Sequence, residues 1–253
     1  MDLGLREKTF LITAASRGLG FAAAQQLVAE GARVLVTGRT RESVDKAVAA
    51  LGGSDVALGL VADNGDPDAA RSLVDAAMER FGRLDGVLIS SGGPPAGQVT
   101  EVEDAQWRTS FESVFLGAIR LARTASEVLG DGGVVGFVLS GTVRQPASGL
   151  ALSNGLRPGL AMAAKGLADE LGPRGVRVIG LMPNQIYTER VQELDALSGD
   201  QVAVRARNEA AIPLRRYGRP EEFGRVAAFL LSPAASYLTG ITVPVDGGAL
   251  RGL

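Results

Sequence analysis

Phe10-Leu-Ile-Thr-Ala-Ala-Ser-Arg-Gly-Leu-Gly20 joins a strand pattern to a helix pattern through a tight, glycine-containing turn. The apolar run 8–13 is typical of a buried parallel strand, and residues 21–30 read as a helix. Such a turn leaves the first N–H groups of the helix unpaired, and the helix dipole favours an anion there. The pattern therefore predicts a pyrophosphate site made by Thr13, Ala15, Ser16, Arg17, Gly18, Leu19 and Gly20.

A plain strand-to-helix turn without a ligand remains the alternative, because Ala14 stands where the usual nucleotide fingerprint begins with glycine. The next strand pattern, residues 33–37, ends in Gly38-Arg39. An NAD site usually has a carboxylate about twenty residues after the glycines, and none stands here. The guanidinium groups of Arg17, Arg39 and Arg41 suit a 2′-phosphate, which favours NADP(H) over NAD(H) unless these arginines are only solvated surface charges.

Composition excludes several function classes. The chain has 26 basic and 28 acidic residues, and a formal charge of -2 offers no field for nucleic acid. It contains no cysteine and no histidine, so neither a thiolate nor an imidazole can act as base or metal ligand, and no metal site is expected. We see no signal peptide and no run of 18 apolar residues, which predicts a soluble, cytoplasmic protein without a membrane partner.

Strand and helix patterns alternate along the whole chain, without a linker or a change of composition. This alternation is typical of an α/β fold, and it predicts one domain over residues 1–253, with a doubly wound, mostly parallel sheet of seven strands and helices on both faces. Strands are expected at 8–13, 33–37, 56–61, 86–89, 133–140, 176–181 and 242–245. Helices are expected at 21–30, 41–51, 66–81, 104–129 and 152–171.

Polar or small residues follow several of these strands, at the edge of the sheet where open α/β folds bind ligands. Asp63 and Asn64 follow the third strand and suit an adenine amino group, unless they only cap the next turn. The loop 90–95 contains Ser91, Gly92 and Gly93, which let backbone lie against a cofactor. Ser140 ends the fifth strand.

The long, charged stretch between Pro183 and Pro213 is the least regular part of the sequence. Segments of this length outside the sheet are usually functional, and we expect a substrate lid over residues 184–213.

Taken together, these features make the chain resemble the short-chain dehydrogenase/reductase family over essentially its whole length. The resemblance rests on 13–20, the Asp63 turn, 90–93, Ser140, Pro183-Asn-Gln-Ile-Tyr-Thr188 and the tail from 213 to 248, which looks like that of bacterial 3-oxoacyl-carrier-protein reductases. It implies a Rossmann fold, a nicotinamide cofactor, and hydride transfer between a small carbonyl compound and its alcohol. It also implies a homodimer or homotetramer, and a cofactor contact by Pro183, Ile186 and Thr188, with Thr188 near the carboxamide.

The catalytic positions of the family depart from its pattern here. The family uses Asn, Ser, Tyr and Lys, and matching position by position gives Val114, Ser140, Ser153 and Arg157. A serine is a poor acid beside a guanidinium, so losing general acid catalysis is expected to cost about 10²- to 10⁴-fold in rate. Arg157 would instead hold the cofactor ribose and attract developing negative charge, with Ser140 donating a hydrogen bond. In the alternative, Arg157 only binds cofactor or carboxylate.

Two further alternatives concern the proton source. Pro158 disfavours helix before it. If Gly155 caps the helix, Ser153 lies outside it, and a one-turn shift would instead present Asn154. Tyr187 is a second candidate acid, although packing within the lid explains it better.

Three functions remain open on the sequence. The first is an NADP(H)-dependent reductase using Ser140, Arg157 and water or Tyr187. The second is a cofactor-binding sensor or partner subunit without turnover. The third is isomerisation or dehydration on the same scaffold.

Overall fold

The computed structural model describes residues 1–197 and 199–252, and within them the chain builds one seven-stranded sheet. Its order is β3-β2-β1-β4-β5-β6-β7, and every neighbouring pair is parallel, which confirms the predicted fold class. The order reverses between β1 and β4, where open α/β sheets bind ligands. The strands are β1 (Thr9–Ile12), β2 (Arg33–Gly38), β3 (Ala57–Val61), β4 (Gly86–Ile89), β5 (Val134–Val138), β6 (Arg177–Pro183) and β7 (Ile241–Val245).

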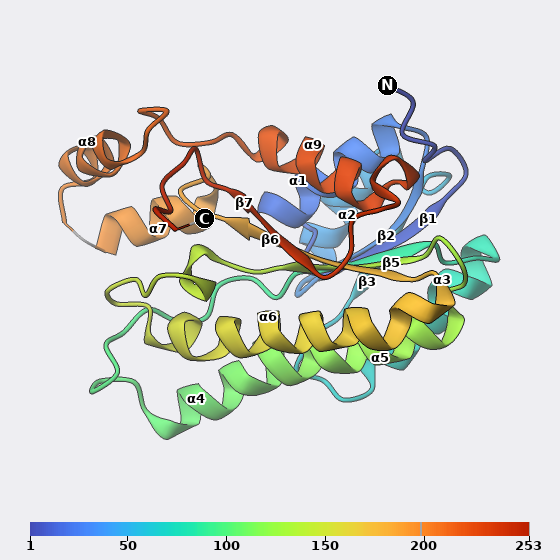
Figure 1. Cartoon of the computed structure of the whole chain (residues 1–253), viewed down its shortest axis with the longest axis horizontal. Helices are drawn as coiled ribbons and strands as arrows, with labels where there is room; N and C mark the ends of the chain where they lie inside the picture. The colour runs from blue at the N-terminus through green and yellow to red at the C-terminus, as the bar shows by residue number, and fades with distance from the viewer. Residues whose placement is uncertain (198, 253) are drawn as a thin grey trace.

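Helices cover both faces of the sheet (Figure 1), with α1 packed on α9 on one side and α3 packed on α5 on the other. Within the described residues, no helix is both long and apolar enough to span a bilayer. The helices are α1 (Gly18–Ala29), α2 (Arg41–Ala50), α3 (Ala69–Phe81), α4 (Asp104–Ser110), the π-helical turn η1 (Phe111–Leu116), α5 (Gly117–Val128), the short 3-10 turn η2 (Gly141–Val143), α6 (Ala151–Leu171), the 3-10 turn η3 (Gly172–Arg174), α7 (Glu189–Leu197), α8 (Gln201–Ala211), α9 (Pro220–Leu231) and the 3-10 turn η4 (Pro233–Ala235).

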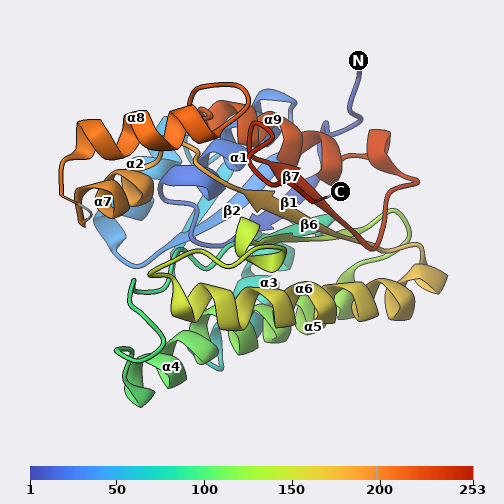
Figure 2. The ribbon, with the colours of Figure 1, turned by 60° about the vertical axis from the view of Figure 1, so that its left-hand side comes forward.

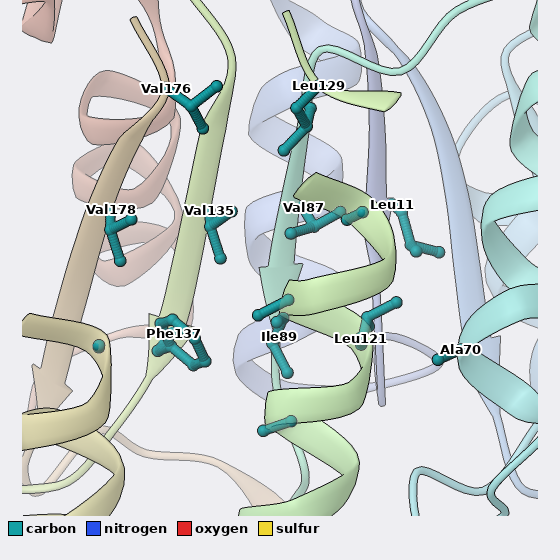
Figure 3. Close-up of a cluster of buried hydrophobic side chains, with 14 of the residues drawn as sticks. Leu11, Ala70, Val87, Ile89, Leu121, Leu129, Val135, Phe137, Val176 and Val178 are labelled. Carbon is teal, nitrogen blue, oxygen red and sulfur yellow. The ribbon is translucent and has the colours of Figure 1, made fainter. Parts of the chain in front are cut away.

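Side chains of alternating direction along the strands build two hydrophobic cores. Leu11, Val87 and Val135 come from β1, β4 and β5 and point to the same face, toward Leu121 of α5 (Figure 3). Their neighbours along each strand point to the opposite face, where they pack with α1 and α9. Because the central strands are buried on both faces, they read in the sequence as continuous apolar runs.

Helix α6 confirms the predicted helix 152–171, and the alternative in which Pro158 delays its start is wrong. Helix α6 begins at Ala151, with Pro158 inside it, and the backbone N–H of Asn154 donates to Leu150 at 2.9 Å. Leu152 and Leu160, with the other buried residues of α6, anchor it on the sheet, and this packing outweighs the local preference of proline. Ser153 therefore lies in the helix.

The stretch after β6 is also more regular than expected, since it forms α7 and α8. The Asp200 side chain caps α8 by accepting from the amides of Val202 and Ala203. Figures 1 and 2 both show the two helices beyond one end of the sheet. Residue 198 of the predicted lid and residue 253 of the predicted domain lie outside the described residues.

Candidate active site

The turn after β1 has the free backbone donors that an anion site needs. Gly18 adopts the left-handed conformation, with φ 61°, and Arg17 makes no side-chain cap on α1. In the part of the chain that the structure describes, the amides of Gly18, Leu19 and Gly20 donate no hydrogen bond. A Cβ at Gly20 would lie 2.9 Å from the Ala14 carbonyl oxygen, so only glycine fits there. The first turn of α1 thus presents a cradle of unpaired N–H groups.

Hydrogen bonds of Thr13 and Ala15 hold this turn in place. The Thr13 hydroxyl donates to the Ser90 carbonyl at 2.6 Å and accepts from the Ser90 amide at 2.9 Å, tying the end of β1 to the end of β4. The Ala15 amide donates to the Thr37 carbonyl at 2.7 Å. The polar groups of Thr13 and Ala15 are therefore already used by the protein.

Ala14, at the position where glycine is usual, keeps a left-handed conformation with φ 48°, and its amide donates to the Thr37 hydroxyl at 3.0 Å. Glycine is needed at Gly38 because the Ser16 side chain packs against it. A Cβ there would lie 2.6 Å from the Ser16 Oγ, so the missing side chain admits Ser16.

The three arginines predicted for a 2′-phosphate have different surroundings. Arg17 pairs with Glu189 at the start of α7. Arg41 lies 3.6 Å from Asp45 within α2. Arg39 is exposed, and across residues 1–197 and 199–252 it has no hydrogen-bond or ion-pair partner.

Asp63 and Asn64 both make hydrogen bonds within the protein. The Asp63 carboxylate accepts from the Gly65 amide at 2.8 Å, which is the turn cap that the sequence left open as an alternative. The Asn64 side chain donates to the Ser90 carbonyl at 3.0 Å, so it joins Thr13 in fixing the end of β4. Asp63 is exposed and keeps its second oxygen for a ligand.

Ser140 and Ser153 are linked through Thr142. The Thr142 amide donates to the Ser140 Oγ at 3.2 Å, so this lone pair is used and the Ser140 proton is directed elsewhere. The Thr142 and Ser153 hydroxyls lie 3.0 Å apart, and Ser153 is 6% exposed. Ser153 is therefore held in the interior, whereas half-buried Ser140 has a proton to donate.

Arg157 is a buried cation beneath the loop after β4. Its guanidinium donates to the Val138 carbonyl, to the Ser91 Oγ at 3.1 Å and to the Gly92 carbonyl at 2.8 Å. Burial lowers the pKa of Arg157 to about 10, so it stays charged at neutral pH. Its Nε is buried without a partner within the described residues.

The segment after β6 contains four predicted residues, of which Thr188 lies near the turn after β1. Pro183 ends β6, and buried Ile186 pairs with Gly218 in an isolated bridge. Thr188 Cγ2 lies 3.9 Å from the place that a Cβ of Gly18 would take. Tyr187 stacks under the Arg205 guanidinium, 4.7 Å from the ring centroid, and is 41% exposed. This packing within the lid is the alternative role named for Tyr187.

Sequence reasoning missed three residues that the structure brings into the site. Thr142 links the two serines, Glu189 meets Arg17, and Arg190 donates to the Pro94 carbonyl at 2.7 Å. The Arg190 side chain also explains Gly93, where a Cβ would lie 2.7 Å from the Arg190 Nε. Thr142 follows Ser140 by two residues, which is a signal for a capped turn. No local signal marks the other two, because their partners are distant in sequence.

Comparisons with known proteins match this fold over the whole chain. A family model described as enoyl-(acyl carrier protein) reductase matches residues 13–249. Human dehydrogenase/reductase SDR family member 4 is 33% identical over 251 residues, covering 96% of this chain and 88% of its own. An uncharacterized oxidoreductase of Methylorubrum extorquens is 33% identical over 250 residues, covering 96% and 98%. A short-chain dehydrogenase/reductase from Brucella melitensis, described as glucose/ribitol dehydrogenase, superposes with a TM-score of 0.92 at 30% identity, covering both chains fully.

The chain belongs to the short-chain dehydrogenase/reductase family. It is thus a member of an oxidoreductase family that binds nicotinamide cofactors and acts on small molecules. L-sorbose reductase from Gluconobacter frateurii, a structure solved with NADPH and L-sorbose, superposes with a TM-score of 0.90 at 27% identity, and each chain is covered fully.

Within this short-chain dehydrogenase/reductase, the position matched to the family asparagine is buried and apolar. Val114 is 2% exposed and lies in the π-helical turn η1. This turn ends against the Asn64 backbone, because a Cβ at Gly117 would lie 1.9 Å from the Asn64 carbonyl oxygen. A valine side chain has no polar atom with which to hold a water.

The residues present fit a dinucleotide. The unpaired amides at the start of α1 suit a pyrophosphate, and the partnerless Nε of buried Arg157 lacks an acceptor of the kind that ribose hydroxyls supply. The unpaired amides lie in the turn after β1, and the Arg157 guanidinium contacts the loop after β4.

Proposed function

We propose that this protein is an NADP(H)-dependent reductase that interconverts a carbonyl compound and its alcohol with a non-standard catalytic set. The observation that carries the proposal is Arg157, a buried guanidinium whose terminal NH2 group donates to Ser91 and Gly92 in the loop after β4, and whose Nε has no partner within the described residues. Among the described residues its partners are carbonyl and hydroxyl oxygens, not a carboxylate. A buried positive charge is costly unless it is both hydrogen-bonded and paired with a negative charge, and a bound anionic cofactor would supply the negative charge that Arg157 lacks.

NADP(H) would be held by the cradle at 18–20, by Arg39 and Arg17 at the 2′-phosphate, and by Arg157 at the nicotinamide ribose. When bound, the cofactor supplies or accepts the hydride. The absence of a carboxylate after β2 supports NADP(H) over NAD(H). L-sorbose reductase, a relative of known structure, was solved with NADPH.

Ser140 is the group that we assign to the substrate oxygen. Because its lone pair accepts from the Thr142 amide, its proton is free to donate to a carbonyl oxygen. Arg157 adds a fixed positive charge that favours negative charge developing on that oxygen. Ser153, bonded to Thr142 and buried, steadies Thr142 and leaves the acid role to water or to Tyr187.

The test is a fluorescence titration with NADPH and NADH, followed by a panel of ketones and 3-oxoacyl thioesters. The proposal expects tighter binding of NADPH than of NADH, and NADPH oxidation with at least one carbonyl compound. Absence of nucleotide binding would remove the proposal.

A cofactor-binding protein without turnover is the second candidate. The observation that favours it is Ser153, which stands at the position matched to the family tyrosine. Its hydroxyl is bonded to Thr142 and does not titrate near neutral pH, so this position offers no acid. Tight NADPH binding with no oxidation of NADPH by any carbonyl compound would select this function.

Isomerisation or dehydration is the third candidate, with Ser140 and Arg157 polarising an oxygen of the substrate. It would appear as substrate conversion without NADPH oxidation.

We also propose that the protein works in the cytoplasm as a homodimer or homotetramer, since members of this family are commonly oligomeric. The faces expected to pair are those of the long helices that begin at Asp104 and Ala151. Light scattering measures the oligomeric state directly.

A further inference from the structure

The first turn of α7 touches both sides of the candidate cofactor crevice. The Glu189 carboxylate pairs with Arg17 in the turn after β1. The next residue, Arg190, donates to the Pro94 carbonyl at 2.7 Å in the loop after β4. Consecutive side chains of one helical turn thus join the two loops between which a dinucleotide would lie.

Glu189 occupies a group that the cofactor would also need. Carboxylate and phosphate both bind the fork of N–H donors on a guanidinium, and one guanidinium cannot give the same donors to both. Arg39, the other arginine after the phosphate turn, has no partner among the residues described. Arg17 alone is therefore shared between the lid helix and a 2′-phosphate.

We propose that Glu189 competes with the 2′-phosphate of the cofactor for Arg17, and that it thereby weakens NADP(H) binding and reduces the selectivity over NAD(H). This inference rests on the proposed function, because it requires NADP(H) in the crevice. When the phosphate takes Arg17, the first turn of α7 loses one of its two ties, so cofactor binding loosens the start of the lid.

The expected effect is modest because the pair is screened by water. The Arg17 and Glu189 side chains are 58% and 61% exposed. Removing such a competitor is expected to lower the Kd for NADPH about two- to fivefold. The Kd for NADH, which has no 2′-phosphate, changes less.

The experiment measures Kd for NADPH and NADH by fluorescence titration at low ionic strength, in wild type and Glu189→Gln. Glu193→Gln is the matched control, since it removes the same charge from the same helix but from a carboxylate 3.6 Å from Arg190. Both substitutions are repeated in an Arg17→Gln background. The inference expects tighter NADPH binding in Glu189→Gln alone, and no such gain when Arg17 is absent.

Two results would overturn the inference and leave the proposed function standing. One is an unchanged NADPH Kd in Glu189→Gln. The other is a gain that Glu193→Gln reproduces or that persists without Arg17, because a general charge effect or a helix-end effect would explain it. A wild type that binds neither nucleotide would remove both proposals.

Discussion

At the scale of single residues, the proposed reaction depends on Ser140 and Arg157, because the tyrosine and lysine of the family pattern are absent. The Ser140 Oγ accepts a hydrogen bond from the Thr142 amide, and Arg157 keeps its positive charge in the interior. Neither delivers a proton easily near neutral pH. Both act by attracting negative charge, which is the kind of stabilisation that hydrogen-bond donors give to a developing oxyanion.

Removing the Ser140 hydroxyl tests the first of these roles. Ser140→Ala is expected to lower kcat about 10²-fold, because one donor to the developing oxyanion is lost. The Kd for NADPH stays within about twofold. Ser153→Ala is the control, and it should change kcat much less, since Ser153 contacts Thr142 in the interior. Equal losses in the two variants would refute the assignment.

Substitution of Arg39 tests the proposed preference for NADP(H) over NAD(H). Arg39→Asp is expected to shift the ratio of NADPH to NADH affinity roughly 10- to 100-fold toward NADH, because a charge-assisted hydrogen bond to phosphate is lost and a carboxylate repels it. Arg41→Asp is the matched control and should shift the ratio less, since Arg41 already faces Asp45. Nucleotide titration measures both, and an unchanged ratio in Arg39→Asp contradicts the interpretation of β2.

The pKa of Arg157 sets the expected pH dependence. Burial lowers this pKa to about 10, so the group is positive below that pH and loses its charge as pH rises through it. The rate of NADPH oxidation is therefore expected to be flat between about pH 6 and 9 and to fall near pH 10. Arg157→Gln, slower throughout, should lack the fall. An inflection between pH 6 and 8 would assign the proton to another group.

At the scale of elements, the close contact between α5 and the turn after β3 supports the site. Gly117→Ala places a Cβ 1.9 Å from the Asn64 carbonyl, and we expect the free energy of unfolding to fall by about 2 to 3 kcal/mol. Gly166→Ala in α6 is the control, because nothing lies near its Cβ, and there alanine is expected to stabilise by about 0.5 to 1 kcal/mol. Urea unfolding measures both. Wild-type stability in Gly117→Ala would show that η1 can move away.

Most elements could be predicted from the sequence because the central strands are buried on both faces, and glycine, aspartate or serine follows several of the strands. The predicted helix 152–171 matches α6, and only the alternative of a late start is wrong, because apolar packing of that helix outweighs the preference of Pro158. Helices α7 and α8 were not predicted, because their sequences carry little apolar signal. Their faces are largely polar, so the apolar period that reveals a helix is weak there.

The site was predictable where its residues follow strands and unpredictable where they meet across the fold. The glycines after β1 and the loop after β4 carry local signals. The pair between Arg17 and Glu189 joins residues 172 positions apart, and the bond from Arg190 to Pro94 joins residues 96 apart. Such contacts depend on how α7 is placed over the sheet.

At the scale of the whole molecule, the sheet carries the cofactor crevice at its reversal point, and α7 and α8 lie beyond the same sheet near the end of β6 (Figure 2). Three segments meet there: the turn after β1, the loop after β4, and the start of α7. The fold is that of the short-chain dehydrogenase/reductase family, whereas the proposed match of catalytic positions keeps one of the four family residues.

Single-turnover oxidation of NADPH tests the central claim most directly. The protein is mixed with less than one equivalent of NADPH and an excess of each carbonyl compound, and the loss of NADPH absorbance is followed over time. The account predicts complete oxidation with at least one compound, slowed about 10²-fold in Ser140→Ala. Bound NADPH that stays reduced with every carbonyl compound would contradict it.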